Sequence, residues 1–136
     1  MADISGLSQL RSFFDSGATR PYEFRRRQLL AFRASLIKYE KDIYDALYQD
    51  LKKVPEESWF TENGLLMQEI NHALKHLKDW MQPERAGTNL LNLPSSSRLY
   101  PSPKGVVLII GPWNFPLQLL LIPVAGAIAA GNCVVV

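Results

Sequence analysis

The last part of the chain, from Gly105 to Val136, contains no charged side chain. All 15 Lys and Arg residues and all 13 Asp and Glu residues lie in the first 104 positions. A change of composition this abrupt predicts that the chain passes from solvated elements into the buried centre of a structure. The chain also closes with Val134, Val135 and Val136, and a buried parallel strand needs neighbours on both sides. We therefore expect this chain to be the front portion of a larger protein.

Composition narrows the possible partners and compartments. The 136 residues are 47% hydrophobic and 21% charged, which suits one modest folded domain. A formal net charge of +2 is too small to favour nucleic acid or an anionic membrane surface as a partner. The single cysteine, Cys133, leaves no internal disulfide and agrees with a reducing compartment. Because the amino terminus lacks the basic start and apolar core of an export signal, we expect a cytoplasmic protein.

Apolar spacing predicts three helices before residue 94. The first covers residues 7–14 and ends near Gly17, the second is one long amphipathic helix from Pro21 to Leu51, and the third begins near Pro55 and stops before Pro83. The expected buried rows are Phe24, Leu29, Phe32, Leu36, Ile43, Leu47 and Leu51 in the second helix and Trp59, Leu66, Ile70, Leu74 and Leu77 in the third. The charged residues between them are interpreted as solvated faces.

Residues 83–103 are rich in proline and serine. Two short runs, Thr88–Leu93 and Arg98–Tyr100, are predicted to be extended, with a turn at residues 94–97. Prolines at this density restrict strands to sheet edges. A pair of edge strands could extend a sheet onto a partner, and a surface linker is an equally consistent interpretation.

The charge-free stretch is longer than the roughly 20 residues that span a bilayer, so a membrane helix has to be considered. Prolines and glycines divide it into shorter pieces. The β-branched runs Val106–Ile110 and Val134–Val136 are typical of buried parallel strands around a crossover helix. We therefore predict no membrane insertion by this segment and an α/β fold, in which an amino-terminal helical layer precedes a strand, a helix and a second strand.

Ligands of open α/β sheets bind beyond the carboxyl ends of the strands. The loop from Gly111 to Asn114 follows the first strand and is therefore the candidate ligand loop. It carries neither of the glycine-rich phosphate-binding patterns, GxGxxG and GxxxxGK[ST]. Asn114 could cap the following helix or donate a hydrogen bond to an oxygen that gains negative charge. Trp113 could cover the core or form the wall of a pocket.

Two motifs in this region resemble a known family. The string PKGVVLIIGPWNFP at residues 103–116, followed by GAIAAGN at residues 126–132, is similar to the first cofactor-domain strand and helix of NAD(P)-dependent aldehyde dehydrogenases. Residues 20–29 and 50–53 resemble the class three and fatty-aldehyde branch of that family. The resemblance implies an incomplete aldehyde dehydrogenase fold with a helical layer at 1–82, an oligomerisation segment at 83–103, and the start of a Rossmann-like NAD(P)-binding domain at 104–136.

The resemblance also implies roles for single residues. Asn114 matches the oxyanion-hole asparagine of the family, and Ile110, Gly111, Pro112 and Trp113 match the loop beside the nicotinamide ribose and ring. In the family mechanism a cysteine thiolate attacks the aldehyde and the asparagine amide holds the resulting oxyanion. Hydride then passes to NAD or NADP, and a glutamate-activated water hydrolyses the thioester. The implied partners are an aldehyde substrate and a second subunit in a homodimer.

The family's nucleophilic cysteine, general-base glutamate and cofactor-domain lysine are expected beyond Val136, so the chain should be inactive alone. Cys133 lies in an apolar run, where burial keeps a thiol unreactive, and is expected to be structural. His72 and His76 have no third ligand beside them and are expected at the surface, without a metal. Two alternatives remain, namely a truncated relative that acts as a non-catalytic interaction module and a membrane-anchored helical protein.

Overall fold

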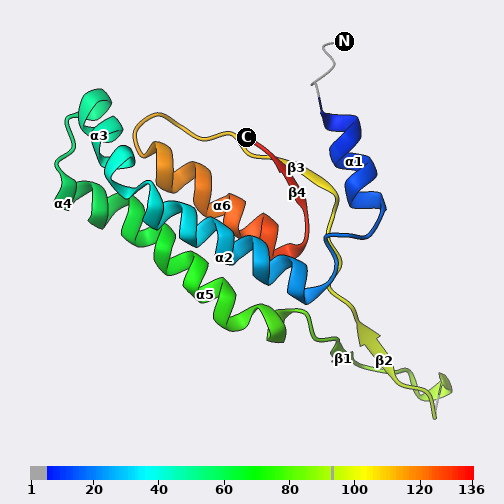
Figure 1. Cartoon of the computed structure of the whole chain (residues 1–136). Helices are drawn as coiled ribbons and strands as arrows, with labels where there is room; N and C mark the ends of the chain where they lie inside the picture. The colour runs from blue at the N-terminus through cyan, green and yellow to red at the C-terminus, as the bar shows by residue number, and fades with distance from the viewer. Residues whose placement is uncertain (1–5, 93) are drawn as a thin grey trace.

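A computed structural model describes residues 6–92 and 94–136, which form a helical body with a small parallel sheet and an arm that leaves it (Figure 1). The helices are α1 (Leu7–Asp15), α2 (Tyr22–Lys38), α3 (Glu40–Leu51), α4 (Pro55–Ser58), α5 (Gly64–Trp80) and α6 (Pro116–Ala130), with a π-helix at Trp59–Asn63 and a 3-10 turn at Leu90–Asn92. The strands are β1 (Glu84–Ala86), β2 (Ser97–Leu99), β3 (Val106–Leu108) and β4 (Cys133–Val135).

The core lies where α2, α5 and α6 pack against one another (Figure 1). Its largest fully buried apolar side chains are Leu29 of α2 and Leu66, Ile70 and Leu77 of α5, each with 0% exposure. Burial of such a side chain is worth about 1.5–3 kcal/mol. Helix α6 contributes Ala125 and Ala129, whose small side chains allow the two helices of the layer to approach its backbone. The predicted helical layer is therefore present.

Strands β3 and β4 are parallel neighbours connected by α6, as the sequence predicts. Val106 pairs with Cys133 and Leu108 with Val135, and the N–H of Ile109 donates to the carbonyl of Val135 at 2.9 Å. The α/β fold class is confirmed. Within the described residues no helix is both long and apolar enough to cross a bilayer.

The prediction of one helix from Pro21 to Leu51 is wrong, because the helix breaks at Tyr39. Tyr39 has a φ of −104° and a ψ of 15°, and α3 leaves the axis of α2 at this point (Figure 1). One turn earlier, the hydroxyl of Ser35 donates to the carbonyl of Ala31 at 3.0 Å, a contact that bends helices. Spacing of apolar residues persists across a bend, so the pattern alone did not reveal it.

The helix predicted from Pro55 does begin there, with Glu56 and Glu57 in its first turn, but it contains the π-helix Trp59–Asn63. Each π-turn holds more residues than an α-turn, so the side chains before it face a different direction. Trp59 is consequently 55% exposed and does not belong to the buried row. That part of the prediction is wrong.

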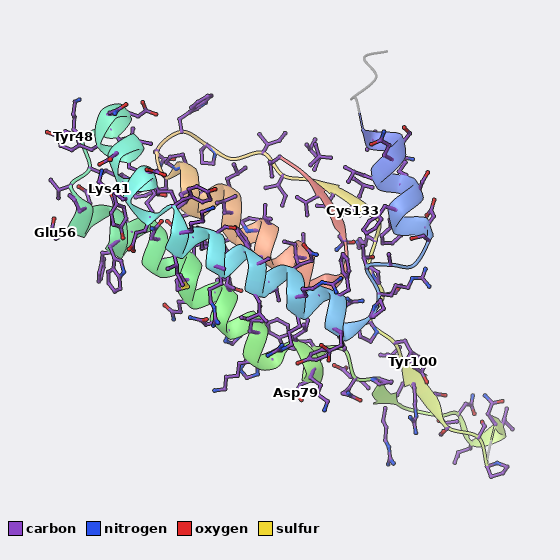
Figure 2. The ribbon with its side chains drawn as sticks, in the orientation of Figure 1. Lys41, Tyr48, Glu56, Asp79, Tyr100 and Cys133 are labelled. Carbon is purple, nitrogen blue, oxygen red and sulfur yellow. The ribbon has the colours of Figure 1, made fainter. Side chains whose placement is uncertain are left out.

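The arm consists of the antiparallel strands β1 and β2, in which Arg85 pairs with Arg98. The prediction that residues Thr88–Leu93 are extended is wrong for residues 90–92, because these form a 3-10 turn. Leu93 lies outside the described residues. The side-chain oxygen of Asn89 accepts the N–H of Leu91 at 3.1 Å and closes this turn. Tyr100, near the base of the arm, is 70% exposed (Figure 2).

Candidate functional site

The five residues singled out from the sequence, Ile110 to Asn114, lie in the loop between the carboxyl end of β3 and the start of α6. Ile110 is 84% and Trp113 90% exposed. A Cβ atom on Gly111 would stand 3.0 Å from the side chain of Leu120 of α6, so glycine allows the loop to pass close above the helix. The structure thus brings the predicted residues together on one exposed edge.

Asn114 does not cap α6. The residue at the cap position is Phe115, and no side chain adjacent in sequence bonds to the helix terminus. The Asn114 side chain is exposed and forms no hydrogen bond with the residues that the structure describes. Its carboxamide is therefore available to a ligand at the sheet edge.

The amino terminus of α6 is capped by a residue from the helical layer. Oε2 of Glu62 accepts the N–H groups of Leu117 at 3.1 Å and Gln118 at 2.9 Å. A carboxylate at this position satisfies two free donors and complements the positive end of the helix dipole. Glu62 itself is completely buried, with 0% exposure.

Lys53 completes this buried cluster. Its Nζ lies 2.6 Å from Oε1 of Glu62 and donates to the backbone carbonyl of Asn114 at 3.2 Å. The ammonium group also lies 4.0 Å from the centre of the Phe115 ring. The interpretation of the charged residues of the helices as solvated faces is therefore wrong for Glu62 and for Arg25, which is 7% exposed. Lys53, which lies between two helices, is also buried.

Sequence reasoning missed Glu62 and Lys53 because nothing in their residue types distinguishes them from surface charges. The π-helix turns Glu62 toward α6, and Gly64 permits that turn, since a Cβ there would stand 2.7 Å from the carbonyl oxygen of Trp59. The sequence instead offered Asn114 as a local cap, because asparagine is among the preferred residues there. The structure has Phe115 at the cap position, so no signal in the sequence pointed to Glu62.

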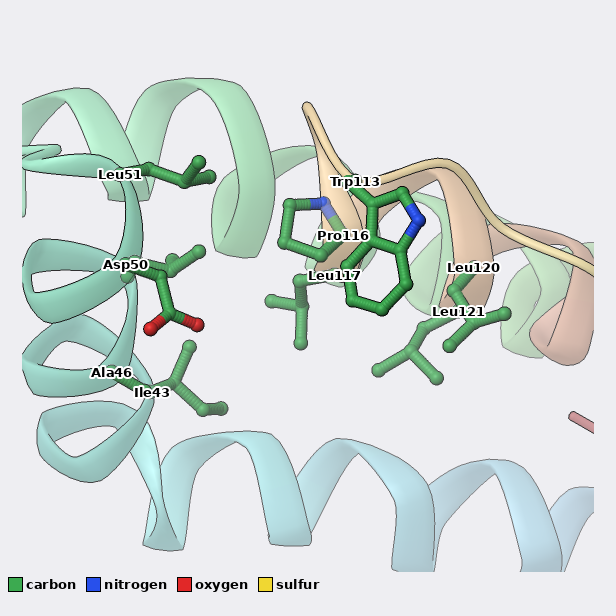
Figure 3. A pocket seen from close by; sticks show the side chains of 10 residues that line it. Ile43, Ala46, Asp50, Leu51, Trp113, Pro116, Leu117, Leu120 and Leu121 are labelled. Atoms are coloured by element: carbon green, nitrogen blue, oxygen red, sulfur yellow. The ribbon is translucent and has the colours of Figure 1, made fainter.

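An apolar hollow of about 560 Å³ lies beside the loop, between α3 and α6 (Figure 3). Trp113 lies on its loop side, and Asp50 is the charged residue in its lining. The other lining residues are Ile43, Ala46, Leu47, Leu51, Pro116, Leu117, Leu120 and Leu121.

Cys133 and the two histidines lie away from this loop. Cys133 is 7% exposed on β4, and burial raises the pKa of its thiol (Figure 2). His72 and His76 lie near Trp80 on α5, with the two imidazole centres 4.5 Å apart and the rings tilted by 44° to each other. Within residues 6–92 and 94–136, no three potential ligands gather as a metal site would require.

Both the sequence and the fold of this chain are similar to those of known proteins. A family model described as the aldehyde dehydrogenase family matches residues 9–136. The chain is 46% identical over 129 residues to mouse aldehyde dehydrogenase family 3 member B2, a match that covers 95% of this chain and 27% of the relative. The chain thus spans about a quarter of the length of that relative.

Two solved structures have the same fold. The substrate-bound AldH of Staphylococcus aureus superposes with a TM-score of 0.93 at 38% identity, covering 98% of this chain and 30% of that one. Glyceraldehyde-3-phosphate dehydrogenase GapN of Methanocaldococcus jannaschii, complexed with NADP, superposes with a TM-score of 0.80 at 19% identity, covering 96% and 27%, which shows the fold alone. The match over residues 9–136 places this chain in the aldehyde dehydrogenase family, a family of NAD(P)-dependent oxidoreductases.

Proposed function

We propose that this chain serves as the amino-terminal part of an enzyme that oxidises aldehydes to carboxylic acids with NAD or NADP. In this proposal the Asn114 amide donates a hydrogen bond to the aldehyde oxygen as that oxygen becomes negative. The observation that carries it is the exposed Asn114 side chain at the carboxyl end of β3, with the helix cap supplied by Glu62 instead. A donor of this kind contributes about 2.7–4 kcal/mol to catalysis.

The loop also fits part of the cofactor. Ile110, Gly111, Pro112 and Trp113 would border the nicotinamide end, where the exposed indole of Trp113 offers a flat apolar surface. Glu62 occupies the N–H groups of α6, so this helix terminus would not hold a phosphate. When bound, the cofactor supplies the hydride acceptor. We also expect the enzyme in the cytoplasm.

The test uses a full-length aldehyde dehydrogenase that contains this segment, for example one in which residues 6–136 replace the matching part of the Staphylococcus aureus AldH. Replacement Asn114→Ala should lower kcat by about 10²–10³-fold and leave the Kd for the nucleotide unchanged. Asn71→Ala, at an exposed asparagine of α5, is the matched control and should leave kcat unchanged. Loss of nucleotide affinity equal to the loss of kcat would contradict an oxyanion role.

The 136-residue chain alone should not reduce NAD or NADP in the presence of an aldehyde, because the proposed nucleophile is not among its residues. The same spectrophotometric assay measures this directly. Steady nicotinamide reduction by the purified chain would show that the proposed assignment is wrong.

We also propose that the arm binds a second copy of the enzyme and so forms a homodimer. The arm exposes four apolar side chains to between 62% and 91%, namely Leu90, Leu91, Leu99 and Tyr100. Exposed apolar side chains on edge strands are suited to pairing with a second chain. Light scattering on the full-length enzyme tests this proposal. The double change Leu99→Lys and Tyr100→Lys should yield monomers, and an unchanged dimer would contradict the assignment.

A further inference from the structure

The Lys53–Glu62 pair directs its contacts toward one short segment, residues 114–118. Glu62 receives the N–H groups of Leu117 and Gln118, and Lys53 donates to the Asn114 carbonyl. Glu62 lies within the π-helix and Lys53 lies before it, so both residues are at least 50 positions earlier in the chain than this segment. Among the described residues, only Lys53 forms a hydrogen bond with the backbone of residues 110–114.

We infer that Lys53 and Glu62 are positioning residues that set the direction of the Asn114 carboxamide. This inference rests on the proposed oxyanion role of Asn114. Lys53 fixes the peptide that follows Asn114, and Glu62 fixes the first turn of α6 immediately afterwards. With both held, the backbone of residues 114–118 has one position relative to the helical layer, and the side chain of Asn114 leaves it in one direction.

Stability alone does not account for this arrangement. A buried ion pair is often no more stabilising than apolar residues of the same volume, because both charges lose their hydration. A local Ser or Asp could cap α6 without any charge burial. Neither apolar residues nor a local cap would hold the loop. The Lys53–Glu62 pair holds both the Asn114 carbonyl and the first turn of α6, while the side chains of the loop remain exposed to a ligand.

The inference predicts a coupling between the pair and Asn114. A misplacement of about 1 Å at a reacting group lowers the rate by up to about 10²-fold. Loss of the pair should therefore reduce kcat only while the Asn114 amide is present to be misplaced. Nucleotide affinity should change little, because neither residue lies in the exposed part of the loop.

The experiment is a double-mutant cycle on kcat in the full-length enzyme described above. Glu62→Gln and Lys53→Met should each lower kcat by about tenfold to hundredfold, with the nucleotide Kd unchanged. In an Asn114→Ala background the same two changes should have almost no further effect on kcat. Lys53→Arg, which keeps the charge, should recover part of the lost kcat. Lys41→Met, at the exposed Lys41–Asp45 pair, is the control and should leave kcat unchanged.

The outcomes separate the two proposals. Suppose that Asn114→Ala lowers kcat, but that Lys53→Met and Glu62→Gln lower kcat by the same factor in the Asn114→Ala background as in the parent. Lys53 and Glu62 are then merely structural, and this inference is overturned. If Asn114→Ala itself has no effect, the proposed function fails first. Should Lys53→Met not fold, Glu62→Gln, which retains an oxygen acceptor for the helix, completes the cycle with the same criterion.

Discussion

The two ends of α6 are capped by charged residues of opposite sign from the same helical layer. At the amino terminus Glu62 accepts from Leu117 and Gln118. At the carboxyl terminus Nη1 of Arg25 donates to the carbonyl of Ala129 at 3.2 Å. Both signs suit the helix dipole, and α6 has no charged residue of its own. An apolar helix is thus oriented by charges that lie elsewhere in the sequence.

The ends differ in how much of the cap is local. At the carboxyl end, Gly131 has a φ of 87°, and the N–H of Asn132 donates to the carbonyl of Ala127 at 2.9 Å. The Asn132 side chain also accepts the N–H of Gly105 at 3.0 Å and joins the helix end to β3. The amino terminus has no such local cap and depends on Glu62. We therefore expect substitutions at the amino-terminal end of α6 to alter the candidate site, and substitutions at its carboxyl-terminal end to alter stability.

The largest effect on stability is expected at the amino-terminal end. Lys53→Met leaves the buried carboxylate of Glu62 without its cation, which should lower the free energy of unfolding by about 3–5 kcal/mol. Urea unfolding of the 136-residue chain measures this. The double variant Lys53→Met with Glu62→Gln removes both charges and should recover much of the loss.

Lys41→Met is the matched control for this comparison, because its ion pair with Asp45 is also 2.6 Å long but lies at the surface. It should leave the unfolding midpoint unchanged. Equal effects of Lys53→Met and Lys41→Met would show that burial of the pair is unimportant.

An intermediate effect is expected at the carboxyl-terminal end. Gly131→Ala places a side chain at positive φ, with its Cβ 2.6 Å from the guanidinium carbon of Arg25, and should lower the free energy of unfolding by about 1–3 kcal/mol. Gly126→Ala, inside α6 with nothing within 4 Å of the new Cβ, should instead raise it by about 0.5–1 kcal/mol. In the full-length enzyme Gly131→Ala should leave kcat near that of the parent at a permissive temperature. A loss of kcat as large as that of Glu62→Gln would remove the distinction between the ends.

Local sequence predicted the strands on either side of α6 better than the amino end of that helix. The β-branched runs before and after α6 indicate strands because buried strands have a characteristic composition. The buried leucines of α2 and α5 followed from helical spacing for the same reason. The loop from Gly111 to Asn114 was predicted as the candidate ligand loop because it follows a parallel strand, and the resemblance to the family added Ile110.

The Lys53–Glu62 pair could not be predicted in this way. Whether a lysine or glutamate is buried depends on which groups of other elements surround it, and here those groups lie 55 and 61 residues further along. Glu62 lies within the π-helix, an irregular turn that depends on tertiary packing as much as on composition. The resemblance to the family identified Asn114, but not the residues that hold its backbone.

The smallest effect is expected at Cys133, which follows the carboxyl-terminal cap. Burial raises the pKa of this thiol, so its thiolate fraction near pH 7.5 should be lower than that of an exposed cysteine. Alkylation by iodoacetamide, measured by mass spectrometry, should be slow in the native chain and ordinary in urea. A group whose pKa is raised by folding contributes stability that is present below its ordinary pKa of about 8.5 and is lost as the pH rises through the raised value.

Cys133→Ala provides the control, because alanine does not titrate and should remove that alkaline loss of stability. Gly131→Ala should speed alkylation of Cys133, since it loosens the cap directly before β4, whereas Gly126→Ala should not. Rapid alkylation of the parent chain at neutral pH would mean that the carboxyl-terminal end of α6 opens readily. In that case the carboxyl-terminal cap of α6 would be no more stable than the cap that Glu62 supplies. The proposed difference between the two ends of α6 would then be wrong.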